Sequence, residues 1–408
     1  MQRSGPVEGS PAEAAVFTTV LTAGAIARAD IARRTGLSSA AVTRAAQPLL
    51  DAGFLRYAED GDATRSSEDE SSRMGRPSRP LVVNAGHTGT VGIKLTQDEA
   101  IGVLCDLSGA VRASRVRPLS DTSLESALAA VDEIVDELRA EGGRLGLAEP
   151  VRHVGLSVSG DVDHASGHVR YSPFLDWRDV DLGPLVAVRT RCAVVVENDV
   201  KALTVAEQWF GLARGLDDFA LITIGAGIGS ALVVDGALVR GAYSVAGEIG
   251  HVPVGDPAVA CHCGGRGCVE AQASTAALLR RCREVAGDDE LTLDAAVDRA
   301  RGGDAALAGV FADAGRLIGL AIASVANLLG PDQVIVSGEG LESYDLLGDA
   351  IRDTFAEQAF GAAARTVLHL RPLPFEEWAR GAAAVALEEL AFPSRVPGGR
   401  RSFGHGDV

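Results

Sequence analysis

Two stretches of this sequence share one pattern, a pair of apolar strand-like runs joined by a short turn. They are residues 91–111, VGIKLTQDEAIGVLCDLSGAV, and residues 221–239, LITIGAGIGSALVVDGALV. Buried strand-like runs that end in polar residues follow at 151–160, 192–199 and 332–340. Two halves that both begin with a strand hairpin predict an α/β protein with two similar lobes and a cleft between them.

The chain is long enough for more than these two lobes. It has 408 residues, and at roughly 150 residues per domain we expect two to three domains. No run of about 20 apolar residues is present, and the first 15 residues lack the apolar core of a signal peptide. Six cysteines in such a chain do not indicate a disulfide framework. We therefore expect a cytoplasmic protein with no membrane partner.

Composition and periodicity divide the chain into six segments. We expect a flexible tail over 1–10 and a compact N-terminal domain over 11–84, with an acidic, serine-rich loop at 58–73. The first lobe should span 88–200 and the second 201–375, which includes a cysteine-rich loop at 247–274. A helix over 376–391 should pack back on the first lobe, and 392–408 should form a polar tail.

The N-terminal domain carries a helix-turn-helix pattern over residues 29–55. Gly36 supplies a tight turn, and Ser38 is a plausible N-cap of the second helix. Positions at helical spacing form the buried stripe of that helix, namely Val42, Ala45 and Leu49. A small helical module for protein contacts remains the alternative to a DNA-binding one.

Charge favours the DNA-binding interpretation of this domain. The first 80 residues are neutral overall, so the rest of the chain carries the whole net charge of −17 and is a poor partner for DNA. The outward side chains at the start of the second helix would face the major groove, namely Ser39, Thr43, Arg44 and Gln47. Arg44 suits a guanine or a phosphate. Further arginines suit the DNA backbone, namely Arg28, Arg33 and Arg34, with Arg76 and Arg79 on a wing.

A cysteine cluster predicts a metal site in the second lobe. Cys261, Cys263 and Cys268 lie within eight positions and can converge through a glycine-rich turn. Thiolate clusters select zinc, and His251, ten residues upstream, can complete a closed tetrahedral site of the structural kind. His262 is a rival fourth ligand, although its neighbours Cys261 and Cys263 make its geometry awkward. Three free thiols, or a redox pair, are the alternative.

The chain resembles the ROK family (repressors, open reading frames and sugar kinases) over residues 15–390. The resemblance rests on GAGIGSALVVDGALVRGAYSVAGEIGH at 225–251 and on CHCGGRGCVE at 261–270. With its N-terminal winged helix-turn-helix, the chain looks like the NagC/XylR-like transcriptional-regulator branch. The resemblance implies a two-lobed fold like that of actin and hexokinase (ribonuclease H-like), which binds a sugar in its cleft.

The resemblance also implies which residues contact the sugar. The matching positions are Asn198, Asp199, Glu248, His251 and Glu270. Ser159 and Gly160 fall where the family has a Pro-Gly turn near the sugar, so Ser159 departs from the pattern. Carboxylates and amides at strand ends that face a cleft suit a polyol. His251 could ligate zinc through one ring nitrogen and contact the sugar through the other.

Kinase activity depends on two phosphate-binding turns in this family. Gly225, Gly227 and Gly229 retain the turn of the second lobe, and Asp199 could act as a vestigial base. The Asp-x-Gly-Gly-Thr turn of the first lobe is replaced by residues 94–98, KLTQD, so its acid has become Lys94 and both glycines are gone. Phosphoryl transfer depends on positioning and charge neutralisation, so this loss predicts a protein without kinase activity.

The resulting expectation is a sugar-responsive DNA-binding regulator of carbohydrate metabolism, and a repressor by resemblance. Its partners would be a pseudo-palindromic DNA operator, a monosaccharide or sugar-phosphate effector, and further copies of itself in a homodimer or tetramer. An active sugar kinase with an accessory N-terminal domain is the alternative. A regulator that has lost its sugar response is a third interpretation.

Overall fold

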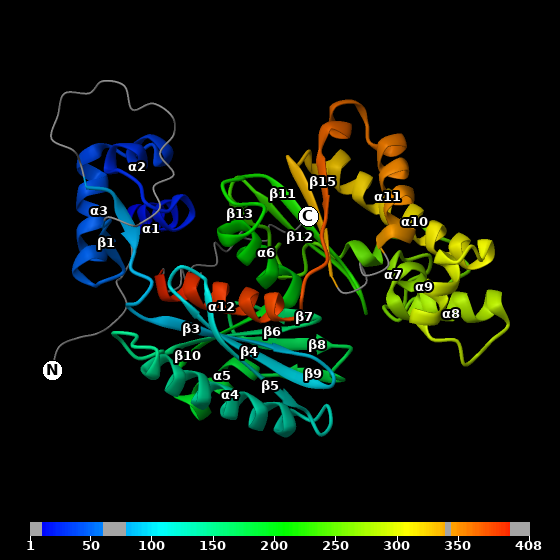
Figure 1. Cartoon of the computed structure of the whole chain (residues 1–408), viewed down its shortest axis with the longest axis horizontal. Coiled ribbons are helices and arrows are strands. Elements are labelled where there is room, and N and C mark those ends of the chain that lie inside the picture. The colour runs from blue at the N-terminus through cyan, green and yellow to red at the C-terminus, as the bar shows by residue number, and fades with distance from the viewer. Residues whose placement is uncertain (1–9, 60–78, 339–343, 392–408) are drawn as a thin grey trace, which may run out of the picture.

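The computed structural model describes residues 10–59, 79–338 and 344–391 (Figure 1). Residues 1–9 and 392–408 of the expected tails, residues 60–73 of the expected acidic loop, and Arg76 lie outside these described residues. The rest forms an N-terminal head beside a larger body that contains two five-stranded sheets.

The head consists of three helices and a short strand pair. Its elements are α1 (Pro11–Ala23), α2 (Arg28–Thr35), α3 (Ser39–Asp51), β1 (Leu55–Tyr57) and β2 (Leu81–Val83). Gly36 ends α2 with a φ of 69°, and the Ser38 hydroxyl accepts a hydrogen bond from the Ala41 amide, so the predicted turn and cap are confirmed. The stripe of Val42, Ala45 and Leu49 is buried. The antiparallel pair β1–β2 adds a wing to this helix–turn–helix arrangement.

The first sheet lies in the lobe that follows the head. The elements of this lobe are β3 (Gly89–Leu95), β4 (Glu99–Asp106), β5 (Val111–Pro118), α4 (Leu124–Arg144), β6 (His153–Val158), β7 (Asp161–Asp163), β8 (His168–Ser172), β9 (Trp177–Val180), α5 (Leu182–Thr190) and β10 (Ala193–Asn198). The strand order is β10-β6-β3-β4-β5, in which β3, β4 and β5 are antiparallel and β6 and β10 run parallel to β3. A separate small sheet contains β7, β8 and β9.

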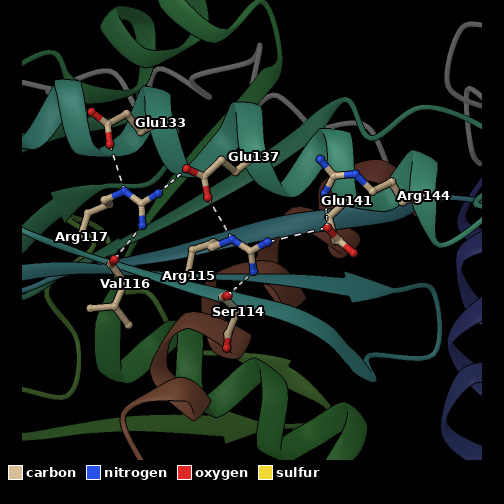
Figure 2. A network of polar contacts seen from close by, with 8 residues as sticks. All are labelled: Ser114, Arg115, Val116, Arg117, Glu133, Glu137, Glu141 and Arg144. Carbon is tan, nitrogen blue, oxygen red and sulfur yellow. Dashed lines mark hydrogen bonds and ion pairs between the residues drawn. The ribbon is translucent and has the colours of Figure 1, made fainter.

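Arginines on the edge strand β5 fasten it to helix α4 (Figure 2). Arg115 Nε lies 2.9 Å from Glu137 Oε2, and Arg117 Nε lies 2.9 Å from Glu133 Oε2. Both arginines are partly exposed, so each ion pair contributes only about 0–1 kcal/mol. Their charged side chains also protect an edge strand against pairing with another chain.

The second sheet repeats the topology of the first. The second lobe contains α6 (Asp199–Phe210), β11 (Phe219–Ile224), β12 (Ile228–Val234), β13 (Ala237–Leu238), η1 (Ile249–His251), α7 (Glu270–Ala273), α8 (Thr275–Ala286), α9 (Leu293–Arg301), α10 (Ala305–Leu329), β14 (Gln333–Ser337), α11 (Tyr344–Gln358), η3 (Gly361–Arg365) and β15 (Val367–Leu370). The strand order β13-β12-β11-β14-β15 again joins three antiparallel strands to two parallel ones. The predicted pair of similar α/β lobes is therefore confirmed.

Helix α12 (Glu376–Ala391) returns from the second lobe and packs on β3 and β6 of the first sheet and against α6. The contact with the sheet requires glycine in both strands. A Cβ at Gly92 would lie 2.1 Å from the carbonyl oxygen of Ala379, and a Cβ at Gly155 would lie 1.9 Å from that of Ala382. Both distances are below any real contact, so only glycine allows this approach.

Helix α10 is the core helix of the second lobe. Its buried face includes Leu307, Phe311, Ile318 and Ile322 and packs with the apolar side chains of the second sheet. By length and composition, this one helix of the described chain would be apolar enough to cross a membrane. Its buried face in this core explains that composition without a bilayer.

The head is attached to the body by packing and by one arginine. Buried apolar side chains of α1 and α3 belong to one cluster with those of α6 and α12. Arg214, just after α6, donates to the carbonyl oxygens of Thr22 and Leu21 at the end of α1. A cation at a helix C-terminus is favourable because it faces the negative end of the helix dipole.

Candidate functional site

A cavity of about 380 Å³ lies between the lobes, at the ends of strands from both sheets. Its volume is sufficient for a monosaccharide. The cavity brings together all seven residues for which sugar contact is predicted, namely Ser159, Gly160, Asn198, Asp199, Glu248, His251 and Glu270. Sugar contact by these residues stays a prediction.

Asp199 is the most completely engaged carboxylate of the cavity. It begins α6 and forms a buried ion pair with Lys94 at the end of β3. The Ser159 hydroxyl donates to the same carboxylate oxygen at 2.6 Å, and the Val200 amide donates to the other at 2.9 Å. Burial alone would raise the pKa of Asp199, but Lys94 and Ser159 outweigh it, so the pKa is lowered. Asp199 is therefore a stable anion that is already neutralised, which makes it a poor proton acceptor.

The turn that follows Lys94 is closed on itself. The Thr96 hydroxyl accepts hydrogen bonds from the amides of Asp98 at 3.3 Å and Glu99 at 3.0 Å. The Thr96 amide donates to the Glu99 carbonyl at 2.9 Å. Three backbone donors of this turn are thus satisfied within the hairpin, whereas a phosphate-binding turn must point such donors at its ligand.

The glycine turn of the second lobe is also partly occupied by protein groups. The Gly225 amide donates to the Gly227 carbonyl at 3.0 Å, and the Ile228 amide donates to Glu270 Oε2 at 2.9 Å. A Cβ at Gly227 would lie 2.9 Å from the same Glu270 oxygen. Gly225, Gly227 and Gly229 line the cavity, and their role as a residual nucleotide turn stays a prediction, since two amides of this turn are already bonded within the protein.

Asn198 serves mainly as a helix cap. Its side-chain oxygen accepts from the amides of Val200 and Lys201, and its amide nitrogen donates to the Gly160 carbonyl at 3.0 Å. Asn198 thus joins the start of α6 to the loop after β6. A sugar would find one remaining Asn198 N–H available.

Four side chains of the second lobe form a cluster that could hold a metal ion. The donor atoms of His251, Cys261, Cys263 and Cys268 all lie within 4.8 Å of one another. Cys263 Sγ lies 3.8 Å from Cys268 Sγ, and Cys261 Sγ lies 3.6 Å from His251 Nδ1. Zinc–ligand bonds of about 2.3 Å to sulfur and about 2.0 Å to nitrogen imply tetrahedral edges of roughly 3.8 and 3.5 Å. The donor set and these two edges fit such an ion.

Thiol chemistry in this cluster is uneven. Burial raises the pKa of Cys268 to about 12 and also raises that of Cys261. The Gly265 amide, which donates to Cys263 Sγ, lowers the pKa of Cys263. A bound cation is the kind of partner that would keep all three sulfurs deprotonated.

The rival ligand His262 is bonded to Glu270, although it also lies near His251 and Cys261. Its Nε2 lies 2.6 Å from Glu270 Oε1, and its ring meets that of His251 edge-on at 5.3 Å. A second four-donor group can be drawn from His251, Cys261, His262 and Glu270. Glu270 is bonded both to His262 of the cysteine loop and to the Ile228 amide of the glycine turn, so it links this loop to this turn.

The DNA-contact candidates lie mostly on the surface of the head. Ser39, Thr43, Arg44 and Gln47 are exposed on α3, and Arg33 and Arg34 are exposed on α2. Arg28 is half-buried, and it and exposed Arg79 both lie over the Tyr57 ring, at 5.4 and 5.2 Å. The face of α3 toward solvent is therefore the predicted one, and its contact with DNA stays a prediction.

Aromatic walls of the cavity are a feature that the sequence reasoning missed. Phe174, Phe375 and Trp378 line it, and Lys94 Nζ lies 5.5 Å from the centre of the Trp378 ring. Aromatic faces suit the C–H faces of a sugar ring and the ammonium group of a lysine. Aromatic residues make up only 4% of the chain. Because they are this rare, the three that lie outside the strands at 174, 375 and 378 could have been proposed from the sequence as residues that line a binding site.

Comparison with known proteins assigns the chain to a class. Residues 90–389 match the ROK family, and because this is well over half of the chain, the protein belongs to that family. The DNA-binding transcriptional dual regulator NagC of Escherichia coli K12 is 27% identical over 361 residues, which are 86% of this chain and 85% of NagC.

Solved structures agree with this assignment. A ROK-family transcriptional regulator homologous to E. coli Mlc matches with a TM-score of 0.76 at 24% identity, over 93% of this chain and 96% of that one. A ROK-family glucokinase from Streptomyces griseus, in complex with glucose and AMPPNP, matches with a TM-score of 0.62 at 27% identity. It covers 73% of this chain and 98% of its own length. The regulators are thus similar over most of the chain, and the kinase over about three quarters of it.

Proposed function

We propose that this protein is a sugar-responsive, DNA-binding transcriptional regulator of carbohydrate metabolism that acts as a repressor in the cytoplasm and transfers no phosphoryl group. The observation that carries the proposal is the ion pair between Lys94 and Asp199. It occupies the carboxylate that a kinase would use as its base, beside a turn whose amides are already bonded. The exposed polar face of α3 supports DNA binding.

The metal of the cysteine loop is proposed to be structural zinc. His251 would bind it through Nδ1 with the thiolates of Cys261, Cys263 and Cys268. A closed site of this kind fixes a loop that has little apolar core of its own. Because His251 also lines the cavity, the metal would hold its ring in place for a ligand.

The connection between sugar and DNA is proposed to run along α6. This helix begins in the cavity at Asp199 and ends at Phe210, whose ring lies under Arg380 of α12 at 5.2 Å. Its 12 residues span about 18 Å. Arg214, just beyond its end, holds the last turn of α1. A ligand that favours one lobe arrangement would therefore also favour one position of the head. The free energy by which it shifts this equilibrium cannot exceed the difference between its binding free energies for the two arrangements.

The DNA partner is proposed to be a pseudo-palindromic operator, read by two heads of a homodimer or tetramer. The test is a gel shift with upstream DNA of the neighbouring genes, with and without a panel of monosaccharides, together with an ADP-release assay on the same samples. Operator binding that responds to a sugar, without ADP release, is the expected result. Hexose-dependent ADP release at a typical kinase rate would support the sugar-kinase alternative instead.

A further inference from the structure

One irregular segment of the second lobe is bonded to the first lobe beside the cavity. This segment, residues 240–247 (RGAYSVAG), runs from the end of β13 to Glu248, and we call it the strap. All of its residues are described, none belongs to a helix or strand, and Tyr243 is 78% exposed. Ser244 has a φ of 64°, a strained value for a residue other than glycine. The Lys201 ammonium of α6 donates to the Ser244 carbonyl at 2.6 Å and so helps to hold this backbone.

Two contacts join the strap directly to the first lobe. At its start, Arg240 Nε donates to Glu197 Oε2 of β10 at 2.9 Å. Further along, Arg170 of β8 donates to the Tyr243 carbonyl oxygen. Arg170 is itself fixed by Asp161 of β7, which accepts from its Nε at 3.0 Å. The strap therefore belongs to one lobe by sequence and is held by side chains of the other.

The pair between Arg240 and Glu197 is the best protected of these contacts. Glu197 is 1% exposed, and its second oxygen accepts from the Asn198 amide at 3.0 Å. Burial alone would raise the pKa of Glu197, but His164 at 3.1 Å and Arg240 outweigh it, so the pKa is lowered. Arg240 Nη2 makes no hydrogen bond within the described chain and lies 3.8 Å from Glu388, which is 40% exposed. Glu197 is thus the main partner of Arg240.

The position of this pair connects the two walls of the cavity. Glu197 directly precedes Asn198 and Asp199, which line the cavity from the end of β10 and the start of α6. The strap leads directly into Glu248, which lines the cavity from the second lobe. A lobe movement that separates β10 from the strap must break the ion pair of Arg240.

We propose that Arg240 is a latch between the lobes, whose ion pair with Glu197 holds the strap on the first lobe in the arrangement of this structure and opens when the lobes adopt a second arrangement. The proposal rests on the proposed two-state response and assigns a residue that sets its balance. A contact that is present in one arrangement stabilises only that one. Its strength therefore determines how much differential binding free energy an effector must supply.

The test measures release of the strap in the full-length protein by chymotrypsin. Cleavage after Tyr243 is identified by a fragment that begins at Ser244. Arg240→Met should be cleaved at least about tenfold faster than the wild type, as expected for loss of a charge-assisted hydrogen bond. The matched control is Arg189→Met, because Arg189 is 34% exposed and pairs at 2.6 Å with Asp132 inside the first lobe. Its cleavage rate should equal that of the wild type.

A second variant keeps the test decisive where Arg240→Met does not fold. Glu197→Gln removes the buried charge and keeps an acceptor for the Asn198 amide. It leaves Arg240, which is 27% exposed, in contact with water. Glu197→Gln should therefore fold and raise the cleavage rate at least about threefold, because a neutral acceptor binds a guanidinium group more weakly than a carboxylate does.

Binding measurements relate the latch to the proposed response. The probes are glucose and N-acetylglucosamine in calorimetry, and upstream DNA in a gel shift. In Arg240→Met or Glu197→Gln the affinity for sugar or for DNA should change at least about threefold, whereas Arg189→Met should change neither. Unchanged cleavage in both latch variants, or faster cleavage with both affinities unchanged, overturns the latch. If the wild type binds neither the sugars nor the DNA, the proposed function is wrong, and the cleavage rates alone decide on the latch.

Discussion

Replacing Lys94 by methionine should destabilise the protein in a pH-dependent way. The side chains of Lys94 and Asp199 are only 6% and 10% exposed, so Lys94→Met leaves a buried carboxylate without its cation. Methionine is similar in length and apolar, so packing against Trp378 should survive. Breaking a buried ion pair by removal of one partner costs about 3–5 kcal/mol.

Protonation of Asp199 sets an upper limit on that cost. The folded Lys94→Met protein can hold Asp199 as a neutral acid. With an ordinary aspartate pKa near 3.9, the free energy needed to protonate the carboxylate is about 4 kcal/mol at pH 7 and about 1.5 kcal/mol at pH 5. In the wild type the pKa of Asp199 is lowered, so its contribution to stability is complete above the ordinary pKa and is lost only as the pH falls below it. Without Lys94, burial remains and raises the pKa, so stability falls as the pH rises from about 4 through that raised value.

Urea unfolding at pH 5 and pH 7 measures both effects. In the wild type, the contribution of the Lys94–Asp199 pair to the free energy of unfolding should be nearly the same at pH 5 and pH 7. The loss of this free energy caused by Lys94→Met should be about 2–3 kcal/mol larger at pH 7 than at pH 5. The double variant Lys94→Met/Asp199→Asn should recover most of the loss, since no buried charge remains. A single variant that costs under about 1 kcal/mol at pH 7, or a double variant that is no more stable than the single one, would refute the reasoning.

Three further perturbations test other parts of the molecule. Cys263→Ser should abolish stoichiometric zinc, measured with a chromogenic chelator, together with sugar binding; intact sugar binding in zinc-free protein would disprove their linkage. Arg44→Ala should weaken operator binding in a gel shift by about tenfold, as expected for loss of a base or phosphate contact, whereas Arg301→Ala on the body should not; equal affinities would remove Arg44 from the DNA face. Gly92→Ala should lower the free energy of unfolding by more than about 2 kcal/mol because its Cβ would strike α12, whereas Gly143→Ala, in open space on α4, should be neutral or stabilising; equal effects would contradict the close packing of α12.

The sequence was informative wherever a local pattern reports a local structure. The strand hairpins, the Gly36 turn and the Ser38 cap depend on neighbouring residues, and all are present. The clustering of Cys261, Cys263 and Cys268 could also be anticipated, because they lie within one loop.

Contacts between distant segments could not be derived in the same way. Lys94 could be recognised as a departure from the kinase turn, but its pairing with Asp199 joins residues 105 positions apart and depends on how β3 and α6 meet. The same holds for Trp378, which reaches the cavity only because α12 crosses back over the first sheet. Glu270 could be identified from a motif as a candidate sugar contact. Its bonds to the Ile228 amide and to His262 could not, because a motif does not show which other protein groups a side chain contacts.

The shared apolar cluster of head and body limits how this protein can be dissected. Val16, Phe17 and Val20 of α1 are fully buried in a cluster that also contains Val205 and Trp209 of α6. A fragment ending near residue 88 would present part of that surface to water and lose the Arg214 anchor. Operator preferences measured on such a fragment would not represent the full-length protein. Fusion of this head to another body would require redesign of the apolar contact surface on both partners.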